Sequence, residues 1–466
     1  MTNPRYISTR GQAPALGFED VLLAGLARDG GLYVPETWPQ FSADDIRAMK
    51  DLSYPDLALK VMTPFIGDAI PAADLKALVE DAYATFDAPD VLPLKQTGDD
   101  EYLLELFHGP TLAFKDVAMQ VLGRFFDYML KKRGQRITIV GATSGDTGSA
   151  AIEACRDKDA IDIFMLHPKG RVSPVQEAQM TSVQAANVHN IAIEGTFDDC
   201  QDRVKDLFND GDFRDRFNLS AVNSINWARV MAQIVYYFWA AVKLGAPDKP
   251  VAFSVPTGNF GNVFAGYGAM QMGLPISKLV VGSNANDILA RFFASGAMEM
   301  AGVVPTTSPS MDIQVSSNFE RLLFDLVDRD GAACARVLTD FRKTGRFEVS
   351  AEQLARARKV FAGARFDDDA TKAVIKQVHE QTGELIDPHS AVGVGAAREC
   401  RGETDAPMVI LATAHPAKFP DAVEDATGLR PALPARLADL LDRPKRCQTL
   451  ANDLDQLKRT IETTLA

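Results

Sequence analysis

One arrangement occurs four times along the sequence: a short apolar run, a polar turn, and then a helical pattern. The apolar runs lie at residues 136–142, 251–255, 279–281 and 408–411, and the turns follow at 143–148, 256–262, 282–287 and 412–415. Strands that alternate with helices predict an α/β fold with a parallel sheet covered on both faces. Ligands of such sheets bind at the carboxyl ends of the strands, so we expect the four turns to converge on one site.

A single lysine, Lys115, lies among apolar neighbours and behind a Gly-Pro turn, in the segment 108–120. Lysine normally has a pKa of about 10.4, but loss of hydration or a neighbouring cation can leave its amine neutral at pH 7. Such an amine can form a Schiff base with pyridoxal phosphate. The alternative is structural: the lysine buries its stem and pairs with Asp116. This segment alone favours the structural alternative.

The chain has 466 residues, of which 46% are hydrophobic, and this composition is typical of a globular protein. Its length is enough for two or three domains. The first ten residues are polar and lack the apolar core of a signal peptide. The most apolar helical stretch, residues 230–242, is too short to cross a bilayer. We therefore expect neither export nor membrane insertion.

The cysteines and the net charge exclude several other classes of protein. Five cysteines are scattered without metal-ligand spacing, which favours a reducing cytoplasm and predicts neither a zinc site nor a disulfide framework. A net charge of −13 disfavours binding to nucleic acid or to anionic membranes. An anionic substrate would need a local basic pocket.

The turn at residues 256–262 is a candidate phosphate cradle. It contains Gly258 and Gly261 and precedes a predicted helix over 263–272, so backbone N–H groups could point at a phosphate beside a helix N-terminus. It matches neither the Rossmann nor the Walker fingerprint of nucleotide-binding proteins. Taken by itself, the turn is more simply explained as a tight turn.

Three further segments carry polar groups suited to a ligand. Residues 143–148 combine hydroxyl and N–H donors at the start of a helix, although an ordinary N-cap explains them equally. Residues 223–229 end in Arg229, a forked cation suited to phosphate that alone is more often a surface ion-pair partner. Residues 412–419 place Thr413, His415 and Lys418 after an apolar run. No nucleophilic-serine or zinc-hydrolase pattern is present.

Taken together, these segments resemble the threonine synthase family, in its bacterial and fungal branch, and more broadly the type II pyridoxal-phosphate enzymes related to the tryptophan synthase β subunit. The match covers nearly the whole chain and keeps its order. The matching segments are 6–11, 29–35, 108–120, 141–148, 223–229, 256–262 and 413–419.

The resemblance implies a fold and a domain division. The fold is the tryptophan synthase β-like type II fold, with two open α/β domains and an N-terminal domain. Residues 1–92 would form the N-terminal domain, 93–135 and 226–466 the large cofactor-binding domain, and 136–225 the small domain. The charged, alanine-rich segment 333–383 is expected to be a helical covering element.

The resemblance also implies an activity: elimination of phosphate from O-phospho-L-homoserine and addition of water to give L-threonine, with pyridoxal phosphate as cofactor. Lys115 would bind the cofactor covalently, and Thr413 would meet the pyridine nitrogen. The cofactor phosphate would bind the loop formed by Thr257, Gly258, Asn259, Phe260, Gly261 and Asn262. The substrate would bind Thr143, Ser144, Asn223 and Arg229, together with Asn286, Asp287 and Lys418.

Two departures from the family pattern bear on this transfer. Many type II enzymes place an asparagine beside the cofactor's phenolic oxygen, whereas this chain has Asp146, which would repel a phenolate unless it is protonated or paired. The resemblance places Asp146 among the cofactor-binding residues, and the alternative is that it serves the loop instead of the cofactor. The long N-terminal extension of plant enzymes, which binds an activating adenosyl compound, is absent, so we expect no such activation. We expect a cytoplasmic monomer or homodimer.

Three alternatives stay open on the sequence. A phospho-lyase on the same scaffold would release a 2-oxo acid and ammonia instead of threonine. A non-catalytic relative would lack cofactor chemistry, although Lys115, the glycine loop and Thr413 argue against it. A nucleotide-dependent α/β enzyme fits the alternating pattern but has no phosphate fingerprint, and fold alone cannot choose among these.

Overall fold

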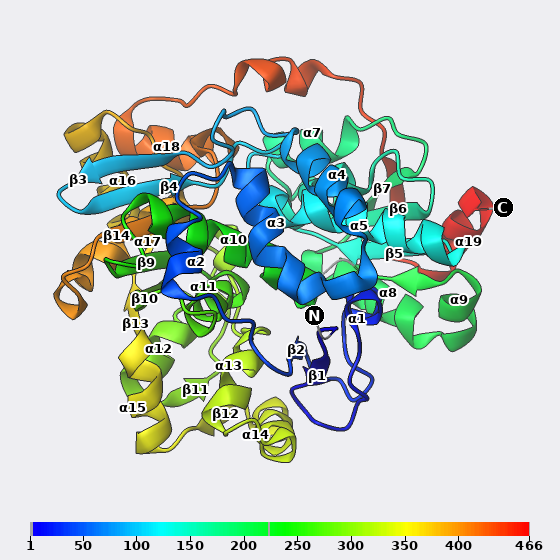
Figure 1. The fold of residues 1–466 in the computed structure, drawn as a ribbon. Helices are drawn as coiled ribbons and strands as arrows, with labels where there is room; N and C mark the ends of the chain where they lie inside the picture. Colours follow the sequence, from blue (N-terminus) through cyan, green and yellow to red (C-terminus); the bar gives the residue numbers. More distant parts are fainter. Residues whose placement is uncertain (1–2, 222–223, 466) are drawn as a thin grey trace. The chain divides into compact units, whose positions relative to one another are not determined.

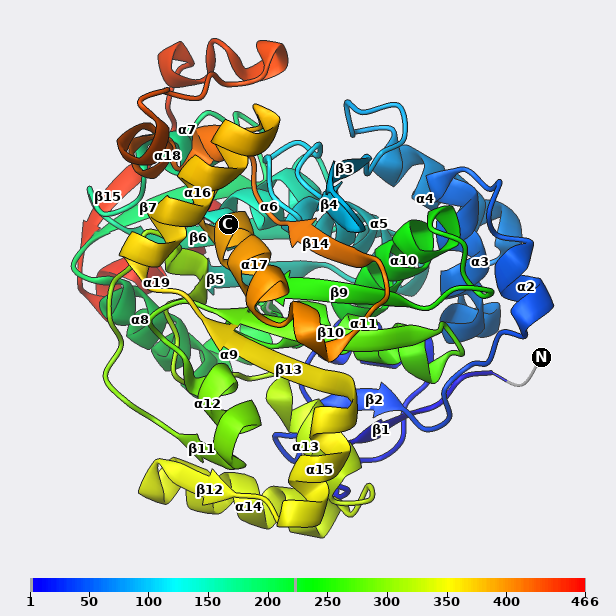
Figure 2. The same cartoon turned by 90° about the vertical axis from the view of Figure 1, so that its left-hand side faces the viewer.

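A computed structural model describes residues 3–221 and 224–465 of the chain. The chain forms two compact units: Met1–Gly109 with Ser224–Pro431, and Pro110–Asn223 with Ala432–Ala466. The α/β class predicted from the sequence is confirmed, because each unit is built on a largely parallel sheet (Figures 1 and 2). The three-part domain division stays a prediction.

The first unit contains a six-stranded sheet in the order β13-β10-β9-β14-β4-β3. β4 (Glu101–Glu105), β14 (Met408–Ala412), β9 (Val251–Pro256), β10 (Ile276–Ser283) and β13 (Phe361–Arg365) are parallel. Only β3 (Leu94–Gly98) is antiparallel, at the edge beside β4. Three of the four strands predicted from the sequence are thus neighbours here, as β9, β10 and β14.

Helices cover both faces of this sheet. α17 (Pro388–Glu399) lies across β9, β10 and β14, and α16 (Asp368–Thr382) packs beside it (Figure 2). On the other face, α11 (Gly261–Gln271) contacts β9 and β10, and α10 (Trp227–Lys243) packs on α11. Successive side chains of a strand point to opposite faces of its sheet. In β9, Ala252 therefore belongs to the core under α17, whereas the ring of the next residue, Phe253, contacts Tyr237 of α10.

The N-terminal segment joins the first unit through aromatic contacts with α10. Trp227 contacts the rings of Tyr6, Trp38 and Phe65, at centroid distances of 5.7, 5.8 and 5.6 Å. The elements of this segment are β1 (Tyr6–Ser8), α1 (Phe18–Ala24), β2 (Tyr33–Pro35), α2 (Ala43–Arg47), α3 (Tyr54–Ile66) and α4 (Ala72–Tyr83).

The segment 333–383 is less uniformly helical than the sequence predicts. It contains β12 (Arg346–Glu348), which pairs with β11 (Ala297–Glu299), and β13, which pairs with β10 at the edge of the main sheet. Both strands are short and lie between charged helices, so local pattern did not reveal them. The helices around them are α12 (Ile288–Ser295), α13 (Phe319–Leu326), α14 (Gly331–Thr344) and α15 (Ala351–Val360), and α18 (Pro420–Thr427) follows β14 later in the chain.

The second unit contains a five-stranded parallel sheet in the order β15-β7-β6-β5-β8. Its strands are β5 (Ile137–Ala142), β6 (Ile161–Pro168), β7 (Val188–Glu194), β8 (Leu219–Ser220) and β15 (Gln448–Ala451). β5 is the fourth strand predicted from the sequence. β15 comes from the C-terminal segment and completes the sheet beside β7.

Two groups of helices accompany this second sheet. α5 (Lys115–Arg133), α6 (Asp146–Cys155) and α7 (Pro174–Thr181) pack in sequence on one another. α8 (Phe197–Asn209), α9 (Gly211–Arg216) and α19 (Leu454–Leu465) share a core with β5, β6 and β7, in which Phe164 and Ile191 meet Leu457. Within residues 3–221 and 224–465, no helix has the length and apolar character needed to cross a membrane.

Candidate active site

Lys115 begins α5 in the second unit and is buried, with 8% of its surface exposed. Its Nζ lies 3.2 Å from Oδ2 of Asp146. Asp116 accepts hydrogen bonds from the backbone amide and the hydroxyl of Thr111, both at 2.7 Å. Lys115 thus has Asp146 as a partner, and the structural alternative of a Lys115–Asp116 pair stays open.

Asp146, the residue that departs from the family pattern, is buried and paired. Besides Lys115, it accepts a hydrogen bond from Nε2 of Gln176 at 2.8 Å. Gln176 is oriented in turn by the Ser173 hydroxyl, which donates to its Oε1 at 3.0 Å. This chain Ser173–Gln176–Asp146 holds the carboxylate against the lysine, and Gln176 and Ser173 were not predicted from the sequence.

The loop that follows β5 is organised by Thr143. Its Oγ1 accepts hydrogen bonds from the amides of Gly145 and Gly148, at 3.0 and 2.9 Å. Gly145 has φ 147°, and a Cβ there would lie 2.4 Å from the Gln176 side chain, so glycine is required. Thr143 is buried while Ser144 is exposed at the start of α6. The Ser144 hydroxyl is thus where a ligand can reach it.

The predicted phosphate loop, Thr257 to Asn262, joins β9 to α11 in the first unit. The Thr257 hydroxyl accepts from the amide of Phe260 at 3.2 Å, and Oδ1 of Asn259 accepts from the amide of Gly261 at 3.0 Å. The amides of Gly258, Asn259 and Asn262 donate to no residue in the described part of the chain. Free amides beside a helix N-terminus form an anion site, so this loop fits a phosphate group.

Arg229 lies on α10, on the face that leads to this loop. Residues 229, 233 and 236 recur at helical spacing, and the Tyr236 hydroxyl contacts both Gln233 and the Oδ1 of Asn262. Arg229 is 4% exposed, and its Nε and Nη1 have no hydrogen-bond partner among the described residues. Burial lowers the pKa of Arg229 to about 10. Burying a guanidinium without a counter-ion raises the free energy of the folded protein, so the site around Arg229 favours an anionic ligand.

Thr413 follows β14 and is held by residues that the sequence did not reveal. Its backbone amide donates to Oγ of Ser390 at 3.1 Å, and the Ser390 hydroxyl donates to Asp387. Asp387 caps α17 and also binds Nδ1 of His389 at 2.7 Å. In the sequence, Asp387 stands before a proline, a pair that indicates the start of a helix. The pair does not indicate that Asp387 also supports Thr413, which lies far away in the chain. The Thr413 hydroxyl hydrogen-bonds to no described residue, so a ring nitrogen can accept from it.

The remaining predicted substrate residues are engaged in protein contacts or lie outside the described residues. Asn286 donates to Val304 and Asp312 and accepts from the Val304 amide, so its amide group braces the loop at 304–312. Asp287 pairs with Arg291 at 2.8 Å and lies 3.7 Å from Arg365. Lys418 is fully buried in a 3₁₀ turn. Asn223 lies outside the described residues. For Asn286 and Asp287 these contacts favour a structural role, and their substrate-binding assignment stays a prediction.

The predicted residues fall into two sets, one on each unit. Lys115, Thr143, Ser144 and Asp146 belong to the second unit, and the phosphate loop, Arg229 and Thr413 belong to the first. In the first unit, the turns after β9, β10 and β14 follow the carboxyl ends of neighbouring parallel strands, as predicted. The turn after β5 is in the second unit, so convergence of all four turns stays a prediction.

These residues define a class of enzyme. A buried lysine at a helix N-terminus, a glycine loop with free amides, and a buried threonine after an adjacent strand are groups that can hold the amine-reactive aldehyde, the phosphate and the ring nitrogen of pyridoxal phosphate. The parallel sheets with helices on both faces agree with the type II fold of such enzymes. The residues present therefore fit this cofactor.

Comparison with known proteins identifies the family. Family models match at residues 5–83 (threonine synthase N terminus), 90–340 (pyridoxal-phosphate dependent enzyme) and 390–461 (threonine synthase, C-terminal). The chain is 57% identical to threonine synthase from Pseudomonas aeruginosa, with 97% of each chain covered. The chain belongs to the threonine synthase family, and pyridoxal phosphate is its cofactor.

Solved structures agree with this assignment. The PLP-bound threonine synthase from Brucella melitensis is 57% identical, with a TM-score of 0.98 and 99% of both chains covered. Threonine synthase from yeast is 42% identical, with a TM-score of 0.95, covering 99% of this chain and 98% of the yeast chain. The type II fold predicted from the sequence is confirmed by these neighbours.

Proposed function

We propose that this protein converts O-phospho-L-homoserine and water into L-threonine and inorganic phosphate. Membership of the threonine synthase family supports this activity. The observation that carries the choice of substrate is Arg229: a buried guanidinium with two unpartnered nitrogens, close to the cofactor loop through Tyr236 and Asn262.

Arg229 would bind the phosphate group of the substrate. A guanidinium can donate two parallel hydrogen bonds to phosphate oxygens, and such charge-assisted bonds are strong where water is excluded. Binding there would also satisfy the nitrogens that the protein leaves without partners. Substrates without a phosphate would leave the buried cation unpaired, so Arg229 would select against them.

The bound cofactor would supply an electron sink for negative charge at the substrate Cα. As a neutral amine, Lys115 would accept the Cα proton, and the Oδ2 of Asp146, 3.2 Å from Nζ, would stabilise the resulting ammonium. Asp146 would thus act on Lys115, and Gln176 would hold the Asp146 carboxylate in place.

Ser144, exposed at the start of α6, would donate a hydrogen bond to the substrate, and Thr143 would keep its loop in shape. Overall, phosphate leaves Cγ and the oxygen of water adds to Cβ.

An assay of the holoenzyme with O-phospho-L-homoserine tests this proposal. We expect threonine and phosphate in equal amounts, and no product from Lys115→Ala. Arg229→Gln should lower kcat/KM by roughly ten- to a hundredfold, the usual effect of losing a charge-assisted contact of about 1.5–3 kcal/mol. Lys243→Gln, at the exposed end of the same helix, is the matched control and should leave kcat/KM unchanged.

The products decide between this activity and its alternatives. Phosphate accompanied by a 2-oxo acid and ammonia would assign a phospho-lyase instead. Cofactor binding without any turnover would revive the non-catalytic alternative. If Arg229→Gln had the same kcat/KM as the native protein, the phosphate would bind elsewhere.

A further inference from the structure

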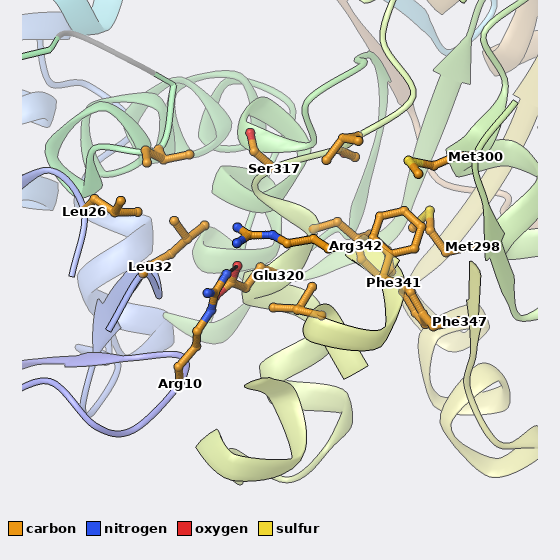
Figure 3. A pocket seen from close by; sticks show the side chains of 16 residues that line it. Arg10, Leu26, Leu32, Met298, Met300, Ser317, Glu320, Phe341, Arg342 and Phe347 are labelled. Atoms are coloured by element: carbon orange, nitrogen blue, oxygen red, sulfur yellow. Dashed lines mark hydrogen bonds and ion pairs between the residues drawn. The ribbon is translucent and has the colours of Figure 1, made fainter. Parts of the chain in front are cut away.

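A cavity lies in the first unit, formed by residues outside both predicted sets. Its volume is about 400 Å³, and its walls come from the N-terminal segment, from residues 298–300 and 315–320, from α14 and from β12. Figure 3 shows Met298, Phe341 and Phe347 gathered on one side of it, with Leu26 and Leu32 on the other. The cavity is large enough for a small organic molecule with an apolar body.

The rim of this cavity exposes apolar side chains. Leu26, Met300 and Val315 line it and are 46%, 39% and 56% exposed. Large apolar side chains that gather at one exposed place mark binding sites, because leaving them in water is unfavourable.

The polar groups of the cavity carry a net positive charge. Glu320 is occupied: it accepts from Nε and Nη2 of Arg10, each at 3.0 Å, and from the Thr9 hydroxyl at 2.6 Å. Figure 3 shows the side chain of Arg342 pointing toward this pair. Arg342 forms no ion pair with any residue in the described part of the chain. One guanidinium therefore faces the cavity without a counter-charge.

Ser316 adds a second polar group without a partner. It lines the cavity and is 9% exposed, and its buried Oγ forms no hydrogen bond to any of the described residues. A buried hydroxyl normally has a hydrogen-bond partner, so an unpartnered one in a cavity wall indicates a ligand.

We propose that this cavity is an accessory binding site for a monocarboxylate with an apolar body. The carboxylate binds the guanidinium of Arg342, and the body packs against Met298, Phe341 and Phe347. A single negative charge balances the single unpaired cation, whereas a phosphate dianion would overcompensate it. Cationic ligands are excluded by the same charge. Glu320 and Arg10 also line the cavity, but each is occupied by the other.

Calorimetry on the cofactor-loaded protein tests this site, with octanoate as the probe below its micelle concentration. We expect saturable binding of one octanoate per chain. Octanamide, which keeps the apolar body but lacks the charge, and acetate, which keeps the charge but lacks the body, should each bind at least tenfold more weakly.

Two neighbouring cations on α14 provide a matched pair of variants. Arg342→Gln should weaken octanoate binding by roughly ten- to a hundredfold, as expected for loss of a charge-assisted bond. Lys343→Gln should leave it unchanged, since Lys343 shares the exposed last turn of the helix but does not line the cavity. Both side chains are exposed, so both variants should keep the native unfolding temperature.

Several outcomes would overturn this assignment. These are the absence of saturable octanoate binding, equal affinity for octanamide, or equal weakening by both substitutions. Because none of these measurements uses catalysis, they are independent of the test of the proposed function.

Discussion

Gly258 and Phe260 show how single residues shape the cofactor loop. Phe260 caps α11 with φ 64°, a left-handed conformation that L-residues rarely adopt. At Gly258, an added Cβ would lie 2.9 Å from Ile313 and 3.0 Å from the Cα of Met311. The loop can therefore keep its position only because residue 258 has no side chain.

Gly258→Ala should weaken binding of pyridoxal phosphate at least tenfold, because the contact with the Met311 backbone forces the loop and its free amides to move. Titration of the apoprotein, followed by the absorbance of the bound cofactor, measures this change. Gly302→Ala is the control, since a Cβ at Gly302 meets nothing within 4 Å. Equal affinities of the two variants would contradict this role of Gly258.

At the scale of single residues, the sequence indicated which side chains carry chemistry, but it did not indicate which other residues they contact in the fold. The roles predicted for Lys115, the glycine loop and Arg229 came from the family resemblance, because the local pattern of each segment alone favoured a structural explanation. The pairing of Lys115 with Asp146 was not predicted, because 31 residues separate them and only the fold brings them together. Asp387 and Ser390 were missed for the same physical reason: they support Thr413 from another helix.

The 3₁₀ turn Pro416–Lys418 depends on the protonation of one side chain. His415 caps it, accepting at Nδ1 from the amide of Ala417 at 3.1 Å. Burial, reinforced by nearby His108, lowers the pKa of His415 to about 4. The folded state therefore keeps this imidazole neutral. Its contribution to stability is complete above the unfolded pKa of about 6.5 and is lost as the pH falls from there toward 4.

His415→Asn should reduce the acid sensitivity of the protein, because asparagine keeps an acceptor for the Ala417 amide but does not titrate. Between about pH 7 and pH 5, the native protein should lose on the order of 2 kcal/mol more unfolding free energy than the variant. Urea unfolding at the two pH values measures the difference. Parallel losses in both proteins would show that another group titrates.

At the scale of elements, strands bounded by polar turns were predicted correctly. β5, β9, β10 and β14 all have an apolar run that ends in a Gly, Ser, Thr or Asn turn. β13 was missed because its residues, Phe361–Arg365, follow directly from a charged helix. Its identity as a strand comes from pairing with β10, a long-range contact that local sequence does not encode.

At the scale of the whole molecule, the second unit depends on the C-terminal segment. β15 pairs with β7, and Leu450, Leu457 and Ile461 complete a core with Phe164 and Ile191. The sequence near residue 450 gave no local signal of this pairing, because it depends on a strand far away in the chain.

Leu457→Ala should lower the free energy of unfolding by about 2–5 kcal/mol, the cost of a cavity at a fully buried leucine. Thr463→Ala, on the exposed side of α19, should change it by less than about 0.5 kcal/mol. Chemical denaturation of both variants measures these values. A small effect of Leu457→Ala would mean that the C-terminal helix adds little to this core.

The return of residues 432–466 to the second unit has a consequence for biosynthesis. A ribosome makes the chain from the N-terminus, so β7 and the apolar face behind it emerge long before β15 and α19. Until residues 448–451 have emerged, that strand edge lacks the neighbour it has in the folded chain and can pair with another nascent chain. A chaperone bound to the incomplete sheet would protect this protein during its synthesis.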